Sequence, residues 1–310
     1  MIVADLDVVV CVDANYALPL AVTLTSLDRA VGDPAATVRV HAMHSGLAPE
    51  VQRRVTASLK AVEVLWYAVD ATAVAGAHFP DWISAATLYR LWLAELLPAD
   101  VDRVLYLDSD VVVTGSLLPA AHLDLGDAVV GAVRDAGNPF PARGFQPCWR
   151  ELGQTPSAPY FNAGVLVIDV ARWRDERVGE RCLEILRRTR PLYADQDALN
   201  AVLEGRWKAL PRRWNVQTND LFDGCSWALD PDDAAAGVAD PLVVHYTERD
   251  KPWEPGSSHP RRDLWFEAVD QSGWAGWRPQ RPRLAAWTDA AANAARAVRR
   301  RLRTSALPRP

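Results

Sequence analysis

Two aspartates separated by one serine directly follow an apolar run, and their types and spacing point to metal chemistry. Residues 104–107 predict a buried strand that ends at Asp108-Ser109-Asp110. Two unpaired carboxylates at the rim of a core repel each other and resist desolvation. A divalent cation such as Mg²⁺ or Mn²⁺ removes this conflict, because both ions accept carboxylate oxygens as ligands. An isolated Asp-X-Asp more often opens a solvated turn, so the interpretation depends on the other motifs of the chain.

Short apolar segments alternate with amphipathic ones along most of the chain. This order predicts an α/β protein with a mostly parallel central sheet flanked by helices. The predicted strands cover residues 8–12, 38–43, 62–67, 104–107, 129–133, 163–170 and 241–245, and the predicted helices cover residues 19–29, 49–59, 85–97, 171–188 and 196–203. In such sheets, ligands bind beyond the carboxyl ends of the strands. Asp13 and Asn15 follow the first strand, so we expect them at the same edge as Asp108 and Asp110.

The composition is that of an ordinary globular protein. The 310 residues are 49% hydrophobic and 24% charged, and the net charge of −5 gives no global attraction to nucleic acid. The four scattered cysteines predict packing residues in a reducing compartment. Asp5 and Asp7 stand where a secretory signal would carry basic residues, and no apolar run reaches the roughly 20 residues that span a bilayer. We therefore expect a cytoplasmic protein, with peripheral attachment at the inner membrane face as the alternative.

The C-terminal segment differs in composition from the rest of the chain. Residues 1–278 are predicted to form one globular domain, and residues 279–310 a basic tail. Apolar residues recur in the tail at steps of three and four, and five arginines lie between residues 296 and 303. This pattern predicts a basic amphipathic helix suited to an anionic membrane surface, or else a terminal helix docked on the body. A nucleic-acid partner would rest on these arginines alone, and we do not expect one.

Five motifs occur along the chain in a fixed order. They are Asp13-Ala-Asn15-Tyr16, Tyr106-Leu-Asp108-Ser109-Asp110, Tyr160-Phe-Asn162-Ala-Gly164, Asp195-Gln196-Asp197-Ala-Leu-Asn200, and His245-Tyr246 with Lys251-Pro-Trp253. In these motifs the chain resembles glycosyltransferase family 8, the retaining transferases that include glycogenin and the bacterial lipopolysaccharide galactosyl- and glucosyltransferases. The resemblance runs from about residue 5 to residue 255. It implies a GT-A type nucleotide-sugar transferase fold, and transfer of glucose or galactose from UDP-glucose or UDP-galactose to an acceptor hydroxyl.

The resemblance also implies a bound metal ion. Asp108, Asp110 and His245 match the family's metal ligands. An imidazole beside two carboxylates suits Mn²⁺ better than Mg²⁺, which favours oxygen ligands, so Mn²⁺ is expected and Mg²⁺ is the alternative. Lys251 matches the residue that holds the pyrophosphate and offsets the charge of the departing UDP. Without the resemblance, Lys251 would be interpreted as a surface charge and His245 as a structural histidine.

The other matched residues belong to the donor pocket. The nucleotide pocket of the family corresponds to Asp13, Asn15 and Tyr16, and Tyr16 can stack on the uracil base. Ser109, between the two metal-binding aspartates, is expected to contact the donor together with Asp108. The residues matched to positions around the donor sugar are Arg90, Asp135, Asn162, Asp195 and Gln196.

Retention of the anomeric configuration needs either a covalent sugar–enzyme intermediate or attack on the face that the leaving group occupies. Gln196 is matched to the family position nearest the opposite face, and an amide is a poor nucleophile. Asp195 is the neighbouring acid. We therefore expect same-face attack, in which a leaving phosphate oxygen accepts the proton of the acceptor. The expected catalytic residues are Gln196, Asp195 and Lys251.

One position departs from the family pattern. In the bacterial enzymes a small residue, commonly glycine, often lies close to the phosphates after the His-Tyr pair, whereas Glu248 puts a charged side chain there. Either this loop is rearranged or Arg249 compensates for the charge. The acceptor can be a glycan, a glycolipid, a peptide or a natural product, and we expect it to contact residues 136–159 and 214–240. A non-catalytic nucleotide-sugar-binding protein on the same fold is the alternative function.

Overall fold

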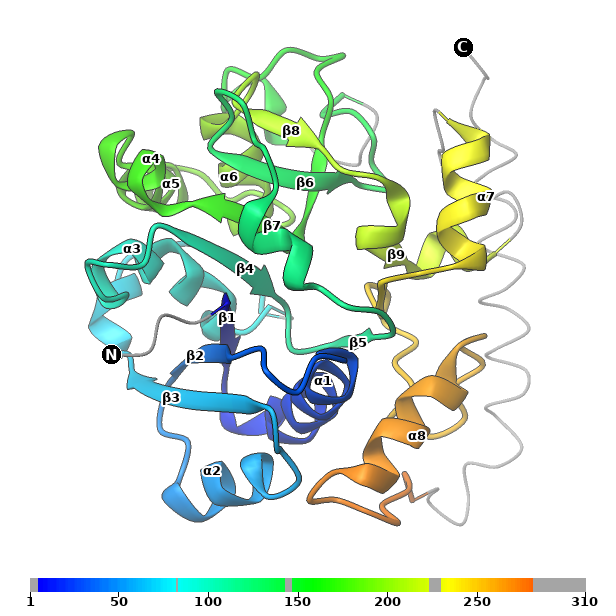
Figure 1. The fold of residues 1–310 in the computed structure, drawn as a ribbon. Helices are drawn as coiled ribbons and strands as arrows, with labels where there is room; N and C mark the ends of the chain where they lie inside the picture. Colours follow the sequence, from blue (N-terminus) through cyan, green and yellow to red (C-terminus); the bar gives the residue numbers. More distant parts are fainter. Residues whose placement is uncertain (1–4, 82, 143–146, 223–229, 281–310) are drawn as a thin grey trace.

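A seven-stranded sheet forms the centre of the protein, with strands in the order β3-β2-β1-β4-β7-β6-β8 (Figure 1). The computed structural model describes residues 5–81, 83–142, 147–222 and 230–280. The strands of this sheet are β1 (Leu6–Val12), β2 (Val38–His44), β3 (Val62–Ala68), β4 (Arg103–Leu107), β6 (Val130–Arg134), β7 (Phe161–Asp169) and β8 (Trp207–Ala209).

The direction of the strands decides which residues meet at one edge. Among the described strands of this sheet, β7 is antiparallel to both of its neighbours and the other six share one direction. The predicted mostly parallel sheet is therefore confirmed. Because β7 is reversed, its amino-terminal residues Phe161 and Asn162 lie at the edge where β1 and β4 end. The motifs that follow β1 and β4 and the motif that begins β7 therefore meet at one edge of the sheet.

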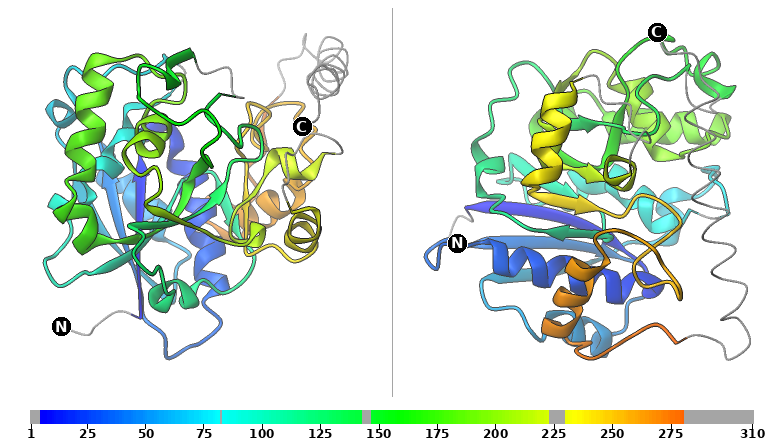
Figure 2. Two further views of the ribbon diagram at one scale, coloured as in Figure 1. Left: turned by 90° about the horizontal axis from the view of Figure 1, so that it is seen from above. Right: turned by 90° about the vertical axis from the view of Figure 1, so that its right-hand side faces the viewer.

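Helices cover both faces of the sheet, as Figure 2 shows. On one face α1 (Ala17–Ala30) and α2 (Pro49–Thr56) pack, and α8 (Arg262–Gln271) lies beside α1. On the other face lie α4 (Val170–Asp175), α5 (Val178–Arg188) and α6 (Asp195–Val202). Alternate residues of β1 serve the two layers: Val8 and Val10 join the α1 cluster, and Val9 joins the α5 cluster. A strand that is apolar on both faces is typical of a sheet sandwiched between helices.

A second, three-stranded sheet connects the end of β4 to the C-terminal half of the chain. It consists of β5 (Val111–Val113), β10 (Val243–His245) and β9 (Val216–Gln217), with β10 in the middle. The pairing of β10 with β5 is antiparallel and sets His245 opposite Val111, directly after Asp110. This short sheet therefore brings the late histidine to the aspartates. The sequence predicted β10, but β5 and β9 are too short to show a period.

The helices agree with the predictions less well than the strands. Most of the helix predicted over residues 85–97 is a 3₁₀-helix, η3 (Ala85–Trp92), followed by the short α3 (Leu93–Leu96). The helix predicted over residues 171–188 is two helices, α4 and α5. The break between them lies at Arg177, which has a positive φ of 51° and directly precedes α5. Helices α7 (Pro231–Ala239) and α8 were not predicted. The other 3₁₀-helices are η1 (Ala14–Tyr16), η2 (Ala71–Val74), η4 (Leu118–His122), η5 (Pro147–Trp149), η6 (Arg212–Trp214) and η7 (Thr218–Leu221).

Several predictions concern the parts of the chain around this core. Cys11, Cys148 and Cys182 are free and buried, as expected of packing residues, whereas Cys225 lies outside the described residues. Within the described ranges, no helix is both long and apolar enough to cross a membrane. The predicted basic helix of the tail falls on residues 281–310, which also lie outside the described part. The described part of residues 136–159 is largely irregular, as predicted, with η5 as a short helical turn.

Candidate active site

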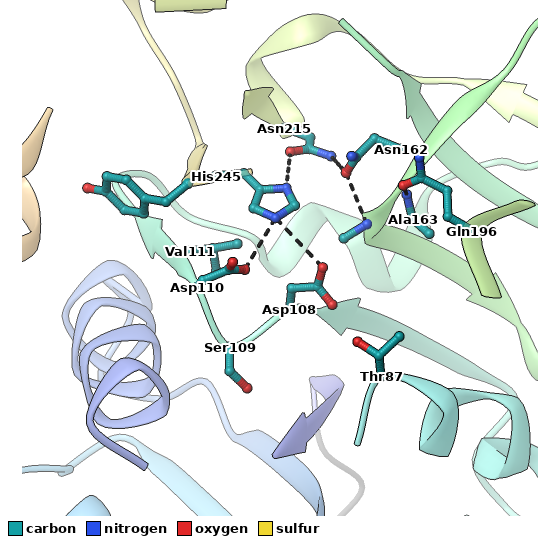
Figure 3. A network of polar contacts seen from close by, with 12 residues as sticks. Thr87, Asp108, Ser109, Asp110, Val111, Asn162, Ala163, Gln196, Asn215 and His245 are labelled. Atoms are coloured by element: carbon teal, nitrogen blue, oxygen red, sulfur yellow. Dashed lines mark hydrogen bonds and ion pairs between the residues drawn. The ribbon is translucent and has the colours of Figure 1, made fainter. Parts of the chain in front are cut away.

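Asp108, Asp110 and His245 converge where β4 ends and β10 ends (Figure 3). One ligand atom of each lies within 4.8 Å of those of the other two. His245 Nε2 is 3.3 Å from Asp110 Oδ1 and 3.7 Å from Asp108 Oδ2. An octahedral ion with bonds of about 2.1 Å holds adjacent ligands roughly 3 Å apart. The two oxygens and one nitrogen therefore have the chemistry and spacing suited to a divalent metal ion.

Each aspartate uses one carboxylate oxygen to bind protein groups and turns the other toward His245. Asp108 Oδ1 accepts hydrogen bonds from the Tyr106 hydroxyl at 2.7 Å and from the Arg90 guanidinium at 2.9 Å. Asp110 Oδ2 accepts from Lys251 Nζ at 2.7 Å. The second oxygen of each carboxylate is the one that faces the imidazole. This division orients both side chains before any ligand arrives.

Lys251 also determines the charge state of Asp110. Burial opposes ionisation of this carboxyl, but the neighbouring Lys251 ammonium and the hydrogen bond to His245 outweigh it and hold the pKa of Asp110 well below its usual value. Lys251 additionally donates to the carbonyl of Tyr246. The lysine predicted to hold the diphosphate therefore lies within the metal-type cluster, directly bonded to one of its carboxylates.

The turn between β4 and β5 is fixed from below by hydroxyl groups. Ser109 Oγ donates to the carbonyl of Cys11 on β1 at 2.8 Å, and Thr23 Oγ1 on α1 donates to the carbonyls of Ser109 and Val111. Ser109 is 6% exposed, and its side chain points away from the two carboxylates (Figure 3). Its hydroxyl thus positions the turn. The contact of Ser109 with the donor stays a prediction. Because the hydroxyl is bonded to Cys11, such a contact would come from the Ser109 backbone.

Arg90 connects the metal-type cluster to the next group of acids. Its guanidinium pairs with Asp108 and, through Nε at 2.8 Å, with Asp195 Oδ2. It also lies over the Tyr106 ring, 4.2 Å from the centroid. Arg90 is 3% exposed, and these partners, distant in the sequence, offset the cost of burying its charge. Asp195 begins α6 after Ala194, a non-glycine residue with a positive φ of 46°.

Burial of Asp195 gives the protein a specific dependence of stability on pH. Burial and the Asp108 charge raise the pKa of Asp195 to about 7, although Arg90 opposes this shift. Between the unfolded value near 4 and the folded value, the native state holds a proton that the unfolded state has lost. The contribution of this group to the free energy of unfolding therefore falls as the pH rises from about 4 to about 7. The free energy of unfolding, measured by chemical denaturation, should differ less between pH 5 and pH 8 in Asp195→Asn than in the unmodified protein. Equal differences in the two proteins would contradict this assignment.

Asp135, Asn162 and Gln196 form a second polar cluster beside the first. Asp135 Oδ2 accepts from Asn162 Nδ2 and from Gln196 Nε2, each at 3.2 Å. Its Oδ1 accepts from the backbone N–H groups of Gly137 and Asn138. Gln196 Oε1 in turn accepts from the N–H of Ala163 at 2.9 Å. The residues predicted to surround the donor sugar, Arg90, Asp135, Asn162, Asp195 and Gln196, therefore lie in one connected network.

The residues predicted to bind the nucleotide directly follow the end of β1. Asp13 caps η1 by accepting from the N–H groups of Asn15 and Tyr16, and its second oxygen accepts from Ser84 Oγ at 2.5 Å. Asn15 is exposed. Tyr16 is half-buried and packs edge-on against Trp253, with ring centroids 5.9 Å apart. Burial raises the pKa of Tyr16, and the charges of Asp110 and Asp108 add to this shift.

Glu248, the charged residue that departs from the family pattern, is bonded to the neighbouring segment. Its carboxylate Oε1 accepts a hydrogen bond from Asn219 Nδ2 at 3.2 Å. Asn219 belongs to η7, which packs beside β9, so this bond joins the loop after β10 to the neighbouring segment.

Three buried residues of the site received no role from the sequence. Asn215 Oδ1 lies 3.0 Å from His245 Nδ1, and Asn215 Nδ2 donates to Asn162 Oδ1. Asp197 accepts from the Tyr160 hydroxyl and from the N–H of Tyr193, and burial raises its pKa to about 6. Asn200 bonds to the backbone N–H and carbonyl of Phe161. Asp197 and Asn200 stand in a motif that the sequence already singled out, whereas Asn215 has no local signal.

Comparison with known proteins agrees with this arrangement. Residues 7–255 match the model of Glycosyl transferase family 8, and the chain belongs to this family. General stress protein A of Bacillus subtilis is 28% identical over 278 residues, which are 87% of this chain and 94% of that protein. Lipopolysaccharide 1,2-glucosyltransferase of Escherichia coli is 31% identical over 201 residues, 62% of this chain and 56% of that enzyme.

A solved structure extends the likeness to three dimensions. The galactosyltransferase LgtC, crystallised with donor and acceptor sugar analogues, superposes with a TM-score of 0.69 at 29% sequence identity. The match covers 90% of this chain and 99% of that one. The predicted family and the predicted GT-A type of fold are both confirmed by these comparisons.

Proposed function

We propose that the protein transfers a hexose from a UDP-sugar to an acceptor hydroxyl with a divalent metal and with retention of the anomeric configuration. The observation that carries this proposal is the continuous cluster in which Asp108 contacts both His245 and Arg90, and Arg90 contacts Asp195. The residues suited to hold a metal ion and the residues matched to the donor sugar are thus joined by direct contacts. Two family relatives are a glucosyltransferase and a galactosyltransferase, which supports glucose or galactose as the transferred sugar.

Asp108, Asp110 and His245 would hold the metal, and Mn²⁺ fits their mixed oxygen and nitrogen donors. When bound, the ion would neutralise the charge that develops on the departing diphosphate. Gly164 contributes by lacking a side chain: a Cβ there would lie 2.1 Å from His245 Cε1 and 2.7 Å from Asp108 Oδ2. The backbone of β7 can therefore approach the cluster closely, as the Gly164 carbonyl also does in accepting from the N–H of Asp108.

Lys251 would stabilise the leaving diphosphate as a positive charge at the rim of the cluster. Lys251→Met is expected to lower kcat by about 10²-fold, because it removes a cation aimed at charge that grows in the transition state. Steady-state UDP release from the identified donor measures this. Lys208→Met on β8 removes an exposed lysine remote from the cluster and serves as the matched control. Equal rates for the two variants would remove Lys251 from the proposed mechanism.

Same-face attack explains retention with the residues present. The acceptor oxygen forms a bond to the anomeric carbon as the bond from that carbon to the diphosphate breaks, and the acceptor proton passes to the departing phosphate oxygen. Gln196 is ill-suited as a covalent nucleophile, because its amide oxygen already accepts from the Ala163 N–H and its nitrogen donates to Asp135. Its bonds instead fit a residue that shapes the sugar pocket.

Gln196→Ala is therefore expected to reduce kcat/KM by about 10- to 100-fold without abolishing transfer, since only positioning is lost. Transfer rates with the identified donor provide the measurement. Intact-protein mass spectrometry of the unmodified enzyme during turnover supplies the second test. A hexosyl adduct on the enzyme, together with complete loss of transfer in Gln196→Ala, would replace same-face attack by a double displacement.

The decisive experiment is UDP release from a panel of UDP-hexoses with Mn²⁺, with and without EDTA, and with Asp110→Ala as the control. Metal-dependent release from one donor, lost in the variant, would support the transferase and identify the sugar. Metal-dependent UDP binding by calorimetry without any turnover would support a non-catalytic nucleotide-sugar-binding protein. The acceptor class, whether glycan, glycolipid, peptide or natural product, can then be tested with the identified donor.

A further inference from the structure

A chain of buried side-chain hydrogen bonds leads from the imidazole of His245 to the carboxylate of Asp135. Its part from His245 through Asn215 to Asn162 is drawn in Figure 3. His245 Nδ1 lies 3.0 Å from Asn215 Oδ1, and Asn215 Nδ2 lies 2.9 Å from Asn162 Oδ1. Asn162 Nδ2 lies 3.2 Å from Asp135 Oδ2. Asn215 is fully buried and the other three are at most 7% exposed. Water is therefore excluded from most of the path, and each group must be satisfied by its neighbours.

The orientation of Asn162 is fixed by two groups whose hydrogen-bonding roles cannot change. The backbone N–H of Gly164 can only donate, and it lies 3.1 Å from Asn162 Oδ1. The other end of the amide faces Asp135, whose carboxylate already accepts from three further N–H groups and is therefore an acceptor. Both anchors require the Asn162 oxygen to face Gly164 and its nitrogen to face Asp135. A flipped amide would lose both bonds.

This orientation propagates to His245. Because Asn162 Oδ1 is an acceptor, Asn215 must present its nitrogen to it, and its oxygen then faces the imidazole. An amide oxygen only accepts, so Nδ1 of His245 must carry the proton. Because Nδ1 keeps its proton, Nε2 is the nitrogen that would give its lone pair to a metal ion, and it is the atom that faces Asp108 and Asp110. Without a metal, the same Nε2 can carry a proton and donate to Asp110. The tautomer is thus set by the N–H of Gly164 and the carboxylate of Asp135. Asn215 and Asn162 connect these two groups to His245.

We propose that Asn215 is a positioning residue that fixes His245 in the tautomer able to bind a metal through Nε2, and that it connects the metal ligand to the sugar-side cluster. The role of His245 as a metal ligand rests on the proposed function; the tautomer does not. Asn215 is suited to this task because it follows η6 and directly precedes β9, which pairs with β10 at His245. Its backbone is held there by its own N–H, which donates to the carbonyl of Arg212 at 3.0 Å.

Two substitutions separate the two halves of this role. Asn215→Asp keeps an oxygen that accepts from Nδ1–H but loses the donor to Asn162. Asn215→Leu has nearly the same shape and loses both bonds. We expect Asn215→Asp to retain Mn²⁺ affinity within about 3-fold and Asn215→Leu to lose about 10- to 100-fold, the range found when a partner of a metal-binding histidine is removed. Recovery in Asn215→Asp is a result that a purely structural role of the side chain would not produce.

Nitrogen-15 NMR of the metal-free protein, labelled at its histidines, tests the tautomer without any activity. His245 is assigned as the signal that disappears in His245→Gln, and its Nδ1 is expected to carry a proton in the unmodified protein. In Asn215→Leu the Nδ1 signal should move toward that of an unprotonated nitrogen, because the acceptor that holds this proton is gone. Asn200→Leu, which removes a similarly buried amide with no bond to the imidazole, is the matched control and should leave the tautomer unchanged.

Each outcome of these measurements bears on the proposal. An unprotonated Nδ1 in the unmodified protein would overturn it without need of a variant, even if Asn215→Leu fails to fold. Unchanged Mn²⁺ affinity in a folded Asn215→Leu would also overturn it. If the unmodified protein shows the expected tautomer but binds no Mn²⁺, the proposed metal function fails, while a tautomer shift in Asn215→Leu still supports the positioning role.

Discussion

Asp110→Asn is expected to reduce metal-dependent UDP release by at least about 10³-fold. The amide that replaces the carboxylate weakens a metal ligand and also removes the negative charge that pairs with Lys251 at 2.7 Å. Loss of one group that stabilises charge in the transition state typically costs 10²- to 10³-fold, and here two groups are affected together. The measurement is release of UDP across a range of Mn²⁺ concentrations, so that a loss of affinity is separated from a loss of rate at saturation.

The control for this variant must change the same chemical group at a site remote from the cluster. Asp270→Asn on α8 removes an exposed carboxylate that pairs with Arg278, and its activity should remain within about 2-fold of the unmodified protein. Thermal unfolding of both variants checks that the fold survives. Full activity in a folded Asp110→Asn would exclude this carboxylate as a metal ligand and would remove the main support for a metal-dependent reaction.

The sequence predicts which residues lie at the edge of the sheet better than it predicts which residues are buried beneath them. Asp13 and Asp108 are identified from local contrast alone, since each is an acid that ends an apolar strand. The burial of Arg90 has no such local sign, because the carboxylates that accept its charge lie on β4 and α6. The reversal of β7 is equally invisible in an apolar run, although it is what brings Asn162 to the same edge as Asp108.

The remaining differences follow from the length of the segments involved. The strand predicted over residues 241–245 is found as β10, whereas β9 has only two residues and shows no period that sequence analysis can detect. Asn215 is bonded to residues 53 and 30 positions away, and nothing in its neighbours announces either contact. Helix α7 is a different case, since Asp230 caps it and Pro231 begins it. That combination is a recognisable start signal, which the prediction overlooked.

Gly164→Ala is expected to disrupt the metal-type cluster with only one added methyl group. The new Cβ would lie 2.1 Å from His245 Cε1 and 2.7 Å from Asp108 Oδ2, far inside normal contact distances. Because β7 is a central strand with bonded neighbours on both sides, the imidazole and the carboxylate must move instead of the backbone. Displacement of reacting groups by about 1 Å can cost 10²-fold in rate, so we expect losses of at least this size in metal-dependent UDP release.

The neighbouring strand offers a control that separates this effect from overpacking in general. Gly131 lies on β6, and a Cβ there would lie 2.9 Å from the end of the Leu125 side chain, which can rotate away. Both variants are expected to lose about 1 to 3 kcal/mol of stability from the added volume. Only Gly164→Ala should also weaken Mn²⁺ binding measured by calorimetry. Equal losses of metal affinity in the two variants would assign the effect to the sheet as a whole, whereas a selective loss would assign Gly164 the task of leaving room for the ligands.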